Sequence, residues 1–204
     1  MKLFYSPASP FARKVHATLI ELGLQDSVEL LLTPVLPGKP IEDYVRSQNP
    51  LGKIPALQLD TGETLFDSTI ICEYLISTGP SATLLPSAGV ERYATLTRQA
   101  LAHGICESAV TIRYETFLRP EERQWETWID DQWGKVERAL DWFETHQVRW
   151  QGDVDLAQIT LGCALGYLDF RAPDHDWRTN HPALTEWFTT FEQRPSMQGT
   201  RPHA

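Results

Sequence analysis

The chain has 204 residues, 42% of them hydrophobic, and a formal net charge of −9 with a pI of about 5.1. These values are typical of a globular protein with enough apolar side chains for one large domain or two small ones, and the acidic balance makes nucleic acid an unexpected partner because like charges repel. No apolar run approaches the ~20 residues of a membrane helix and no signal-like segment opens the chain, so we expect a cytoplasmic protein that does not contact membranes.

Strands and helices alternate in the first 79 residues. The apolar spacing predicts strands over residues 3–5, 28–32, 56–59 and 63–66, and helices over 11–22, 41–46 and 68–76. Gly23 ends the first helix, and the stretch DTGE is typical of a hairpin turn between the last two strands. The order βαβ followed by ββα predicts a small mixed-sheet α/β domain over residues 1–79.

A run rich in Gly, Pro and Ser, residues 80–86, is predicted to link this domain to a second one over residues 87–204. No strand is evident there, and helices are predicted over 88–118, 121–147, 155–170 and 182–193, with a loose tail after them. This half contains every tryptophan of the chain, and helical spacing predicts that they pack in the core: Trp125, Trp128, Trp133, Trp142, Trp150, Trp177 and Trp187.

The helix predicted over residues 155–170 is apolar on nearly every face, so we expect it at the centre of a helical bundle. Asp155 and Gln158 have the spacing of a capping box at its start. Gly162 and Gly166 would let neighbouring helices approach closely.

The stretch YSPASPFARKV, residues 5–15, reads as a strand end, a tight loop and a helix start. Ser9 fits the N-cap and Pro10 the first helical position, which could be their whole role. The free N–H groups of a helix start, together with the Ser9 hydroxyl, also suit an anion, a carboxylate or a thiolate. Arg13 and Lys14 add positive charge one turn on, unless both are simply solvated.

Two later segments favour a ligand site. In NPLGKIPAL, the Ile54–Pro55 bond precedes a strand and is a candidate for cis geometry, which would expose the main chain of Ile54 to an extended peptide. In LFDSTIICEYL, Asp67 and Ser68 stand at a helix start, where Ser68 suits a carboxylate and Asp67 an ammonium group. Together the three segments would provide groups that bind each part of a small peptide containing a thiol.

In this order, and followed by an all-helical half, SPASPFARKV, NPLGKIPAL and FDSTIICEYL resemble a cytosolic glutathione transferase, in particular a bacterial serine-type member, over nearly the whole chain. The stretch CALGYLDFR is similar to the central helix of a bacterial subfamily. The resemblance implies a thioredoxin-like α/β N-terminal domain, an all-α C-terminal bundle domain and a homodimer. It also implies glutathione as co-substrate, bound as a thiolate that attacks a small electrophile or reduces a peroxide, as in detoxification.

The resemblance also implies residue roles. Ser9 would donate to the sulfur, with the Phe11 backbone N–H as the alternative donor. The rest of glutathione would be held by Ile54 with Pro55 cis (cysteinyl backbone), by Asp67 and Ser68 (γ-glutamyl end), and by Lys53 and Lys39 (glycyl carboxylate). No tyrosine stands at the sulfur position. No cysteine stands there either, and its absence disfavours mixed-disulfide chemistry. Gln158 replaces the aspartate usual in the central capping motif.

The pocket for a small electrophile is expected between the Ser9 loop and the first long helix of the second half, with His103, Cys106, Arg113 and Tyr114 as candidate wall residues. Two alternatives stay open. One is a non-catalytic binding or regulatory module with the same fold. The other is a glutathione-dependent isomerase of the maleylacetoacetate type, which ranks third because the loop lacks the cysteine of such proteins.

No metal site is predicted. Cys72, Cys106 and Cys163 lie far apart and have no metal-ligand spacing, so reduced thiols are expected. In PDHDW, the adjacent residues 174–176 cannot easily converge on one ion, which indicates a solvated loop. The other histidines have no partners recognisable from sequence: His16, His103, His146, His181 and His203.

Overall fold

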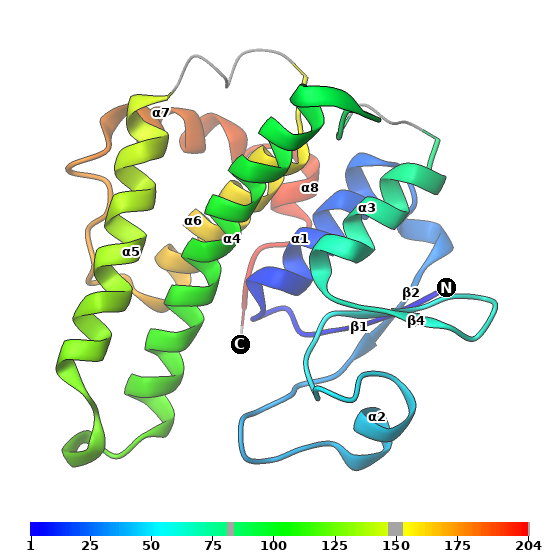
Figure 1. Cartoon of the computed structure of the whole chain (residues 1–204), viewed down its shortest axis with the longest axis horizontal. Coiled ribbons are helices and arrows are strands. Elements are labelled where there is room, and N and C mark those ends of the chain that lie inside the picture. The colour runs from blue at the N-terminus through cyan, green and yellow to red at the C-terminus, as the bar shows by residue number, and fades with distance from the viewer. Residues whose placement is uncertain (81–83, 147–152, 204) are drawn as a thin grey trace.

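The computed structural model describes residues 1–80, 84–146 and 153–203, and it contains a small sheet flanked by helices followed by a group of helices (Figure 1). The sheet has the strand order β2-β1-β3-β4. Strand β1 (Lys2–Tyr5) pairs in parallel with β2 (Glu29–Leu32) and antiparallel with β3 (Ala56–Gln58), which pairs antiparallel with β4 (Thr64–Leu65). This is the mixed sheet that the sequence predicts.

The helices of the first half lie on both sides of this sheet. In Figure 1, α1 (Pro10–Glu21) and α3 (Ser68–Thr78) lie on one side, and α2 (Glu42–Ser47) lies on the other. The turn between β3 and β4 needs a glycine, because Gly62 has a φ of +93°. The predicted hairpin is therefore confirmed.

The second half is helical, and no strand occurs after residue 86 within the described ranges. Its helices are α4 (Gly89–Leu118), α5 (Glu126–Thr145), α6 (Leu156–Arg171), α7 (Pro182–Phe191) and the short α8 (Pro195–Gln198). The prediction of one helix over 121–147 is wrong at its start, where a 3₁₀ turn precedes α5, and its end at 147 lies outside the described residues. The predicted last helix stops at 191, and α8 follows it.

The tryptophans do not all pack in the core. Trp177 is 2% exposed, whereas Trp125 and Trp128 are 63% and 39% exposed. Trp125 precedes α5 instead of lying on its buried face, so the predicted apolar stripe begins too early. Trp150 lies outside the described residues.

Helix α6 is the centre of the helical half, as predicted. It is buried from Leu156 to Leu168 and begins with the complete capping box of Asp155 and Gln158. Its glycines face close neighbours, since a Cβ at Gly162 would lie 2.8 Å from the Phe191 ring and one at Gly166 would collide with the Arg13 guanidinium. Both glycines thus permit the close approach inferred from the sequence.

Helix α1 is covered by both halves of the molecule, because it packs against α3 on one side and against α6 and α8 on the other. Arg13 is only 6% exposed, and its Nε and Nη2 donate to Thr200 Oγ1 at 3.3 Å and to the Met197 carbonyl at 3.1 Å. Lys14 is 1% exposed. The alternative that both cations are solvated is therefore wrong, and the tail is not loose at Thr200, which is buried.

A polar contact joins α1, α3 and α4 beneath the first turn of α1. Lys14 Nζ lies 3.3 Å from both Thr69 Oγ1 and His103 Nδ1, and the His103 ring also contacts Phe11 with centroids 4.9 Å apart. Burial, and secondarily the charge of Lys14, lower the pKa of His103 to about 4. At neutral pH the imidazole is therefore neutral and accepts from the lysine, so His103 has a partner that its sequence context did not reveal.

The core is continuous between the two halves. Leu156 and Ile159 of α6 pack with Leu3 and Leu75 in one buried cluster. Leu84, just after the undescribed residues 81–83 of the predicted linker, is buried in the same cluster and accepts from the Leu156 N–H at 2.8 Å. The end of the predicted linker is thus fixed to α6.

We expect Gly162→Ala to lower the free energy of unfolding by about 1–3 kcal/mol, because the new Cβ would force Phe191 and Met197 to move in a packed core. Gly104→Ala is the matched control, since a Cβ at that position of α4 meets nothing within 4 Å, and it should raise the stability by up to about 1 kcal/mol. Urea unfolding of both variants measures the difference, and equal effects would contradict the packing argument.

Candidate functional site

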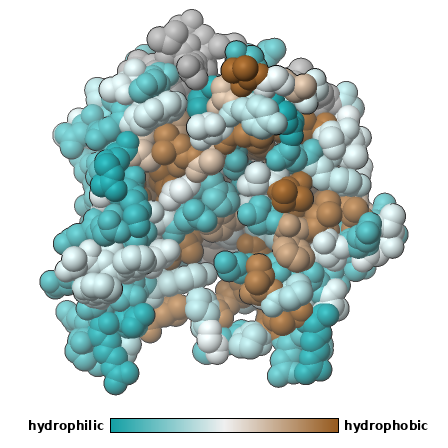
Figure 2. All heavy atoms as spheres, viewed as in Figure 1, coloured by the Kyte–Doolittle hydropathy of each residue, from teal (hydrophilic) through white to brown (hydrophobic). Residues whose placement is uncertain are grey.

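Three segments that are far apart in sequence meet beside the first turn of α1. Phe4 in β1 pairs with Ala56 in β3, so the Ile54–Pro55 turn stands next to the end of β1 and the loop that leads into α1. Thr69 at the start of α3 contacts Lys14, which brings that helix start to the same place. The face seen in Figure 2 is hollowed below its middle, between the lower parts of α4 and α5 and the region of α2.

Ser9 caps α1, and its hydroxyl oxygen accepts from the Ala12 N–H at 3.2 Å. The loop before it is closed by a hydrogen bond of 3.0 Å from the Ser9 N–H to the Ser6 carbonyl. Within the described residues nothing accepts from the Phe11 N–H. The cap uses only an oxygen lone pair, so the Ser9 O–H proton and the Phe11 N–H both remain available as donors.

The Ile54–Pro55 bond is cis, as predicted. The carbonyl of Lys53 just before it is held by two donors, the Tyr44 hydroxyl at 2.6 Å and the Asn49 amide at 2.7 Å. Burial raises the pKa of Tyr44 to about 12, so the phenol keeps its proton and can donate. In the described ranges the main chain of Ile54 has no hydrogen-bond partner, and it is therefore free to pair with a peptide.

Two polar side chains stand at the start of α3, and among the described residues only one of them has a hydrogen-bond partner. Asp67 is exposed and caps the helix, with Oδ1 accepting from the Thr69 N–H at 2.8 Å. Ser68 is 1% exposed, and its hydroxyl has no hydrogen-bond partner among the described residues. An unpaired buried hydroxyl costs about 1–3 kcal/mol, which makes it a candidate donor for a bound ligand.

The two candidate lysines, Lys39 and Lys53, are both exposed and take part in none of the ion pairs found in the described chain. Lys53 follows Gly52, whose φ of +61° turns the chain toward the cis bond. Lys39 lies in the loop after β2, in an isolated bridge with Leu36. Both side chains are thus free to approach an anion.

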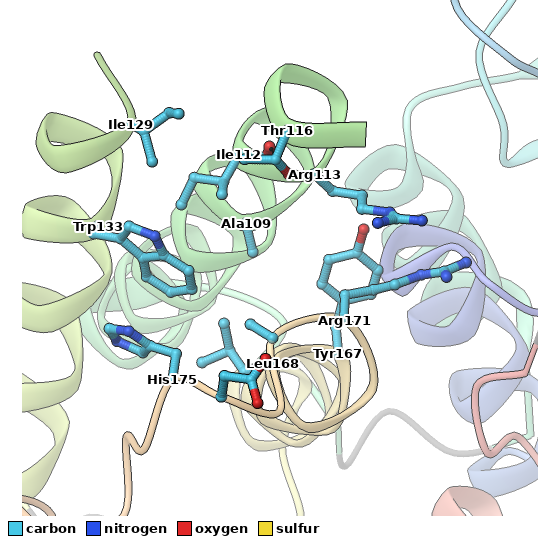
Figure 3. A pocket seen from close by; sticks show the side chains of 12 residues that line it. Ala109, Ile112, Arg113, Thr116, Ile129, Trp133, Tyr167, Leu168, Arg171 and His175 are labelled. Atoms are coloured by element: carbon cyan, nitrogen blue, oxygen red, sulfur yellow. Dashed lines mark hydrogen bonds between the residues drawn. The ribbon is translucent and has the colours of Figure 1, made fainter. Parts of the chain in front are cut away.

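A cavity of about 330 Å³ opens among α4, α5, α6 and the loop after α6 (Figure 3). Its lining includes Ala109, Ile112, Arg113, Thr116, Ile129, Trp133, Tyr167, Leu168, Arg171, Ala172, Asp174 and His175. Of the four wall residues predicted from sequence, only Arg113 is among them, and no residue of the Ser9 loop is.

The other three candidates lie elsewhere. His103 faces Lys14 and Phe11 instead of this cavity. Cys106 is 2% exposed in the helical core and does not line the cavity, and burial raises the pKa of its thiol. Tyr114 is 39% exposed. Tyr167 and Arg171, which do line the cavity, were missed because the predicted central helix gave no sign of which residues would face outward.

In the PDHDW stretch Asp174 and Asp176 are exposed, as the prediction of a solvated loop requires, but His175 contacts neighbouring side chains. His175 Nε2 lies 2.6 Å from Glu137 Oε1, and its ring stacks on Trp133 with centroids 3.8 Å apart. In the part of the chain that the structure describes, His, Cys, Asp and Glu side chains form no group of three that could hold a metal ion. Within residues 1–80, 84–146 and 153–203, none of the helices combines the length and the hydropathy that spanning a bilayer requires.

Comparison with known proteins identifies the family. Residues 3–83 match the glutathione S-transferase N-terminal domain, and residues 126–190 match the C-terminal domain. A glutathione transferase family member from Pseudomonas fluorescens Pf-5, solved with bound glutathione, is 44% identical, with a TM-score of 0.96 over 100% of this chain and 99% of that one.

Two further relatives agree. A glutathione S-transferase from Methylobacillus flagellatus KT, solved with glutathione bound, is 36% identical with a TM-score of 0.88 over 99% of each chain. The uncharacterized GST-like protein YibF of Escherichia coli K12 is 34% identical over 99% of this chain and 98% of its own length. The chain therefore belongs to the glutathione S-transferase family.

Proposed function

We propose that the protein is a glutathione transferase that binds glutathione as a thiolate and uses it to attack a small electrophile or to reduce a peroxide. The observation that carries the proposal is the set of unpaired groups around the first turn of α1. They are the Ser9 O–H, the Phe11 N–H, the main chain of Ile54 and the buried hydroxyl of Ser68.

These groups match the parts of glutathione in order. The main chain of Ile54 would pair with the cysteinyl unit as an added strand does. The γ-glutamyl carboxylate would accept from the Ser68 hydroxyl at the start of α3, with Asp67 beside it for the ammonium group. Lys53, and with it Lys39, would approach the glycyl carboxylate.

The energetics are sufficient without a metal or a protein nucleophile. A free thiol has a pKa of about 8.5, and lowering it by about two units requires roughly 2.7 kcal/mol of differential stabilisation. A hydrogen bond to a charged group contributes about 1.5–3 kcal/mol, and a helix N-terminus adds about 0.3–1 kcal/mol. Ser9 and the first turn of α1 can together supply this amount.

The relatives with bound glutathione support the same co-substrate for this chain. A structure from Pseudomonas fluorescens Pf-5, also 44% identical, contains S-(propanoic acid)-glutathione, which supports a site that accepts a group on the sulfur. The three cysteines of this chain are free, which fits action in the reducing cytoplasm.

We also propose a homodimer that buries an apolar surface formed by Phe66, Ile70, Val90 and Tyr93, which are 36%, 50%, 81% and 69% exposed. An ion pair between Glu73 of α3 and Arg92 of α4 connects the two helices near these residues. Figure 2 shows apolar atoms near the start of α3 on the visible face. Large apolar side chains that are exposed on neighbouring elements mark a candidate protein interface.

Ser68→Ala should weaken glutathione binding about tenfold or more, since a hydrogen bond to a carboxylate contributes about 1.5–3 kcal/mol. The stability of the ligand-free protein should not fall, because this hydroxyl has no partner in the described protein. Ser77→Ala on the exposed face of the same helix is the matched control. Calorimetry measures both affinities, and an unchanged affinity for Ser68→Ala would remove this serine from the site.

Ser9→Ala should raise the pKa of the bound thiol by at least one unit while glutathione affinity stays nearly the same. Because Ser9 also caps α1, Ser9→Gly should be compared, since glycine removes the hydroxyl but retains most of the capping stability. Ser6→Ala is the control in the same loop. Titration of thiolate absorbance in the complex is the measurement, and an unmoved curve would reassign the donor to the Phe11 N–H.

Ile70→Glu combined with Tyr93→Glu should convert the dimer to a folded monomer, because two charges would be buried at the proposed interface. Trp125→Glu is the control, since Trp125 is similarly exposed, at 63%, but lies near the start of α5. Sedimentation velocity gives the masses. A wild-type protein that sediments as a monomer, or a dimer that survives both charges, would refute the interface.

A further inference from the structure

One end of the cavity is cationic. Arg113 from α4 and Arg171 from α6 both line it, and Figure 3 shows their side chains extending to the same side, away from Trp133 and His175. The phenol of Tyr167 lies between the two arginines in that view. Three hydrogen-bond donors from two helices therefore converge at this end.

No carboxylate among the described residues forms an ion pair with either arginine. Half of the arginines in the described chain have acidic partners: Arg46, Arg92, Arg98, Arg119, Arg178 and Arg194. Arg113 and Arg171 instead lie over aromatic rings, with Cζ 3.7 Å from the Phe117 centroid and 4.0 Å from the Phe170 centroid. Stacking holds the guanidinium groups in place and leaves their N–H edges open.

The surroundings make this end receptive to an anion. Burial, and next the neighbouring charge of Arg171, lower the pKa of Arg113, so the two cations disfavour one another. Burial raises the pKa of Tyr167 to about 12, and the phenol is therefore a proton donor at neutral pH. A carboxylate among these groups would relieve the repulsion and accept charge-assisted hydrogen bonds.

This end lies close to the start of α1. The Arg13 guanidinium reaches Gly166, the residue before Tyr167 on α6, and the backbone N–H of Arg13 donates to the Ser9 carbonyl at 2.9 Å in the first turn of α1. A helix rises about 1.5 Å per residue, so Arg171 is only about 8 Å along α6 from Gly166. The arginine pair therefore lies on the two helices, α4 and α6, that pack against α1, where the glutathione sulfur is proposed to lie.

The other end of the cavity is mainly apolar. Ile129, Leu168 and the Trp133 ring line it, and the Trp133 ring is stacked on His175. Asp174 is the one acidic residue among those that line the cavity, and it is exposed beside His175 in the loop after α6. The cavity is thus mainly apolar at one end and cationic at the other.

We infer that the electrophile is an organic acid whose carboxylate is bound by Arg113, Arg171 and Tyr167 while its apolar part lies toward Trp133. The inference rests on the proposed function and specifies the substrate class. The planar guanidinium groups match a carboxylate, to which each can donate two hydrogen bonds.

Conjugates of glutathione test the inference without requiring turnover. We use two acids, the S-(3-carboxypropyl) and S-(4-carboxybenzyl) conjugates, and compare each with its neutral carboxamide. The two pairs place the acid or amide group at two different distances from the sulfur. The wild-type protein should bind the acid of at least one pair about tenfold or more tightly than its amide. Calorimetry measures each Kd together with that of glutathione itself.

Arg113→Gln and Arg171→Gln should each reduce this acid preference several-fold, and the double variant should abolish it, with glutathione affinity unchanged. Arg123→Gln, an exposed arginine in the turn before α5, is the control and should keep the preference. Equal affinities for acid and amide in both pairs, or a preference that survives in the double variant, would overturn the inference alone. Failure to bind glutathione itself would overturn the proposed function and the inference with it.

Discussion

The site depends on the burial of α1 between the two halves of the molecule. Arg13 and Lys14 lie in its first turns, and each donates to groups that only the folded chain brings near, Thr200 in one case and His103 in the other. Because the helix is fixed on both sides, its start cannot shift relative to α3 or α6. The donors at its first turn, Ser9 and Phe11, are therefore held in position before any ligand arrives, and little ordering remains to oppose binding.

This arrangement leaves polar groups unsatisfied in the ligand-free protein. The Ser68 hydroxyl is buried without a partner in the described chain, and the main chain of Ile54 is likewise unpaired there. Each such group costs stability, and the apolar core shared by β1, α3 and α6 offsets that cost. A fold selected only for stability would pair these groups internally, so their joint presence at one place favours a binding site over a structural role.

The sequence predicts features that are local in the chain. The hairpin glycine, the capping box at Asp155 and the cis bond before Pro55 each depend on a few adjacent residues, and each is found. Features that depend on how helices are rotated against one another were not predictable. Helical periodicity assumes one buried face, so it could not reveal that Lys14 is buried by a second neighbour, nor that Arg113 and Arg171, 58 positions apart, line one cavity.

The distribution of charge reconciles an acidic protein with anionic ligands. The chain carries a net charge of −9, yet cations with no carboxylate partner in the described structure border the proposed site, among them Lys53, Arg113 and Arg171. Repulsion from the acidic surface is screened beyond about 8–10 Å at physiological salt, whereas cations that border a binding site act on a bound anion at contact distance, where the attraction is strongest. A large polyanion is therefore repelled mainly by the acidic surface of the protein. A small peptide or acid that enters the proposed site is attracted mainly by the cations that border it.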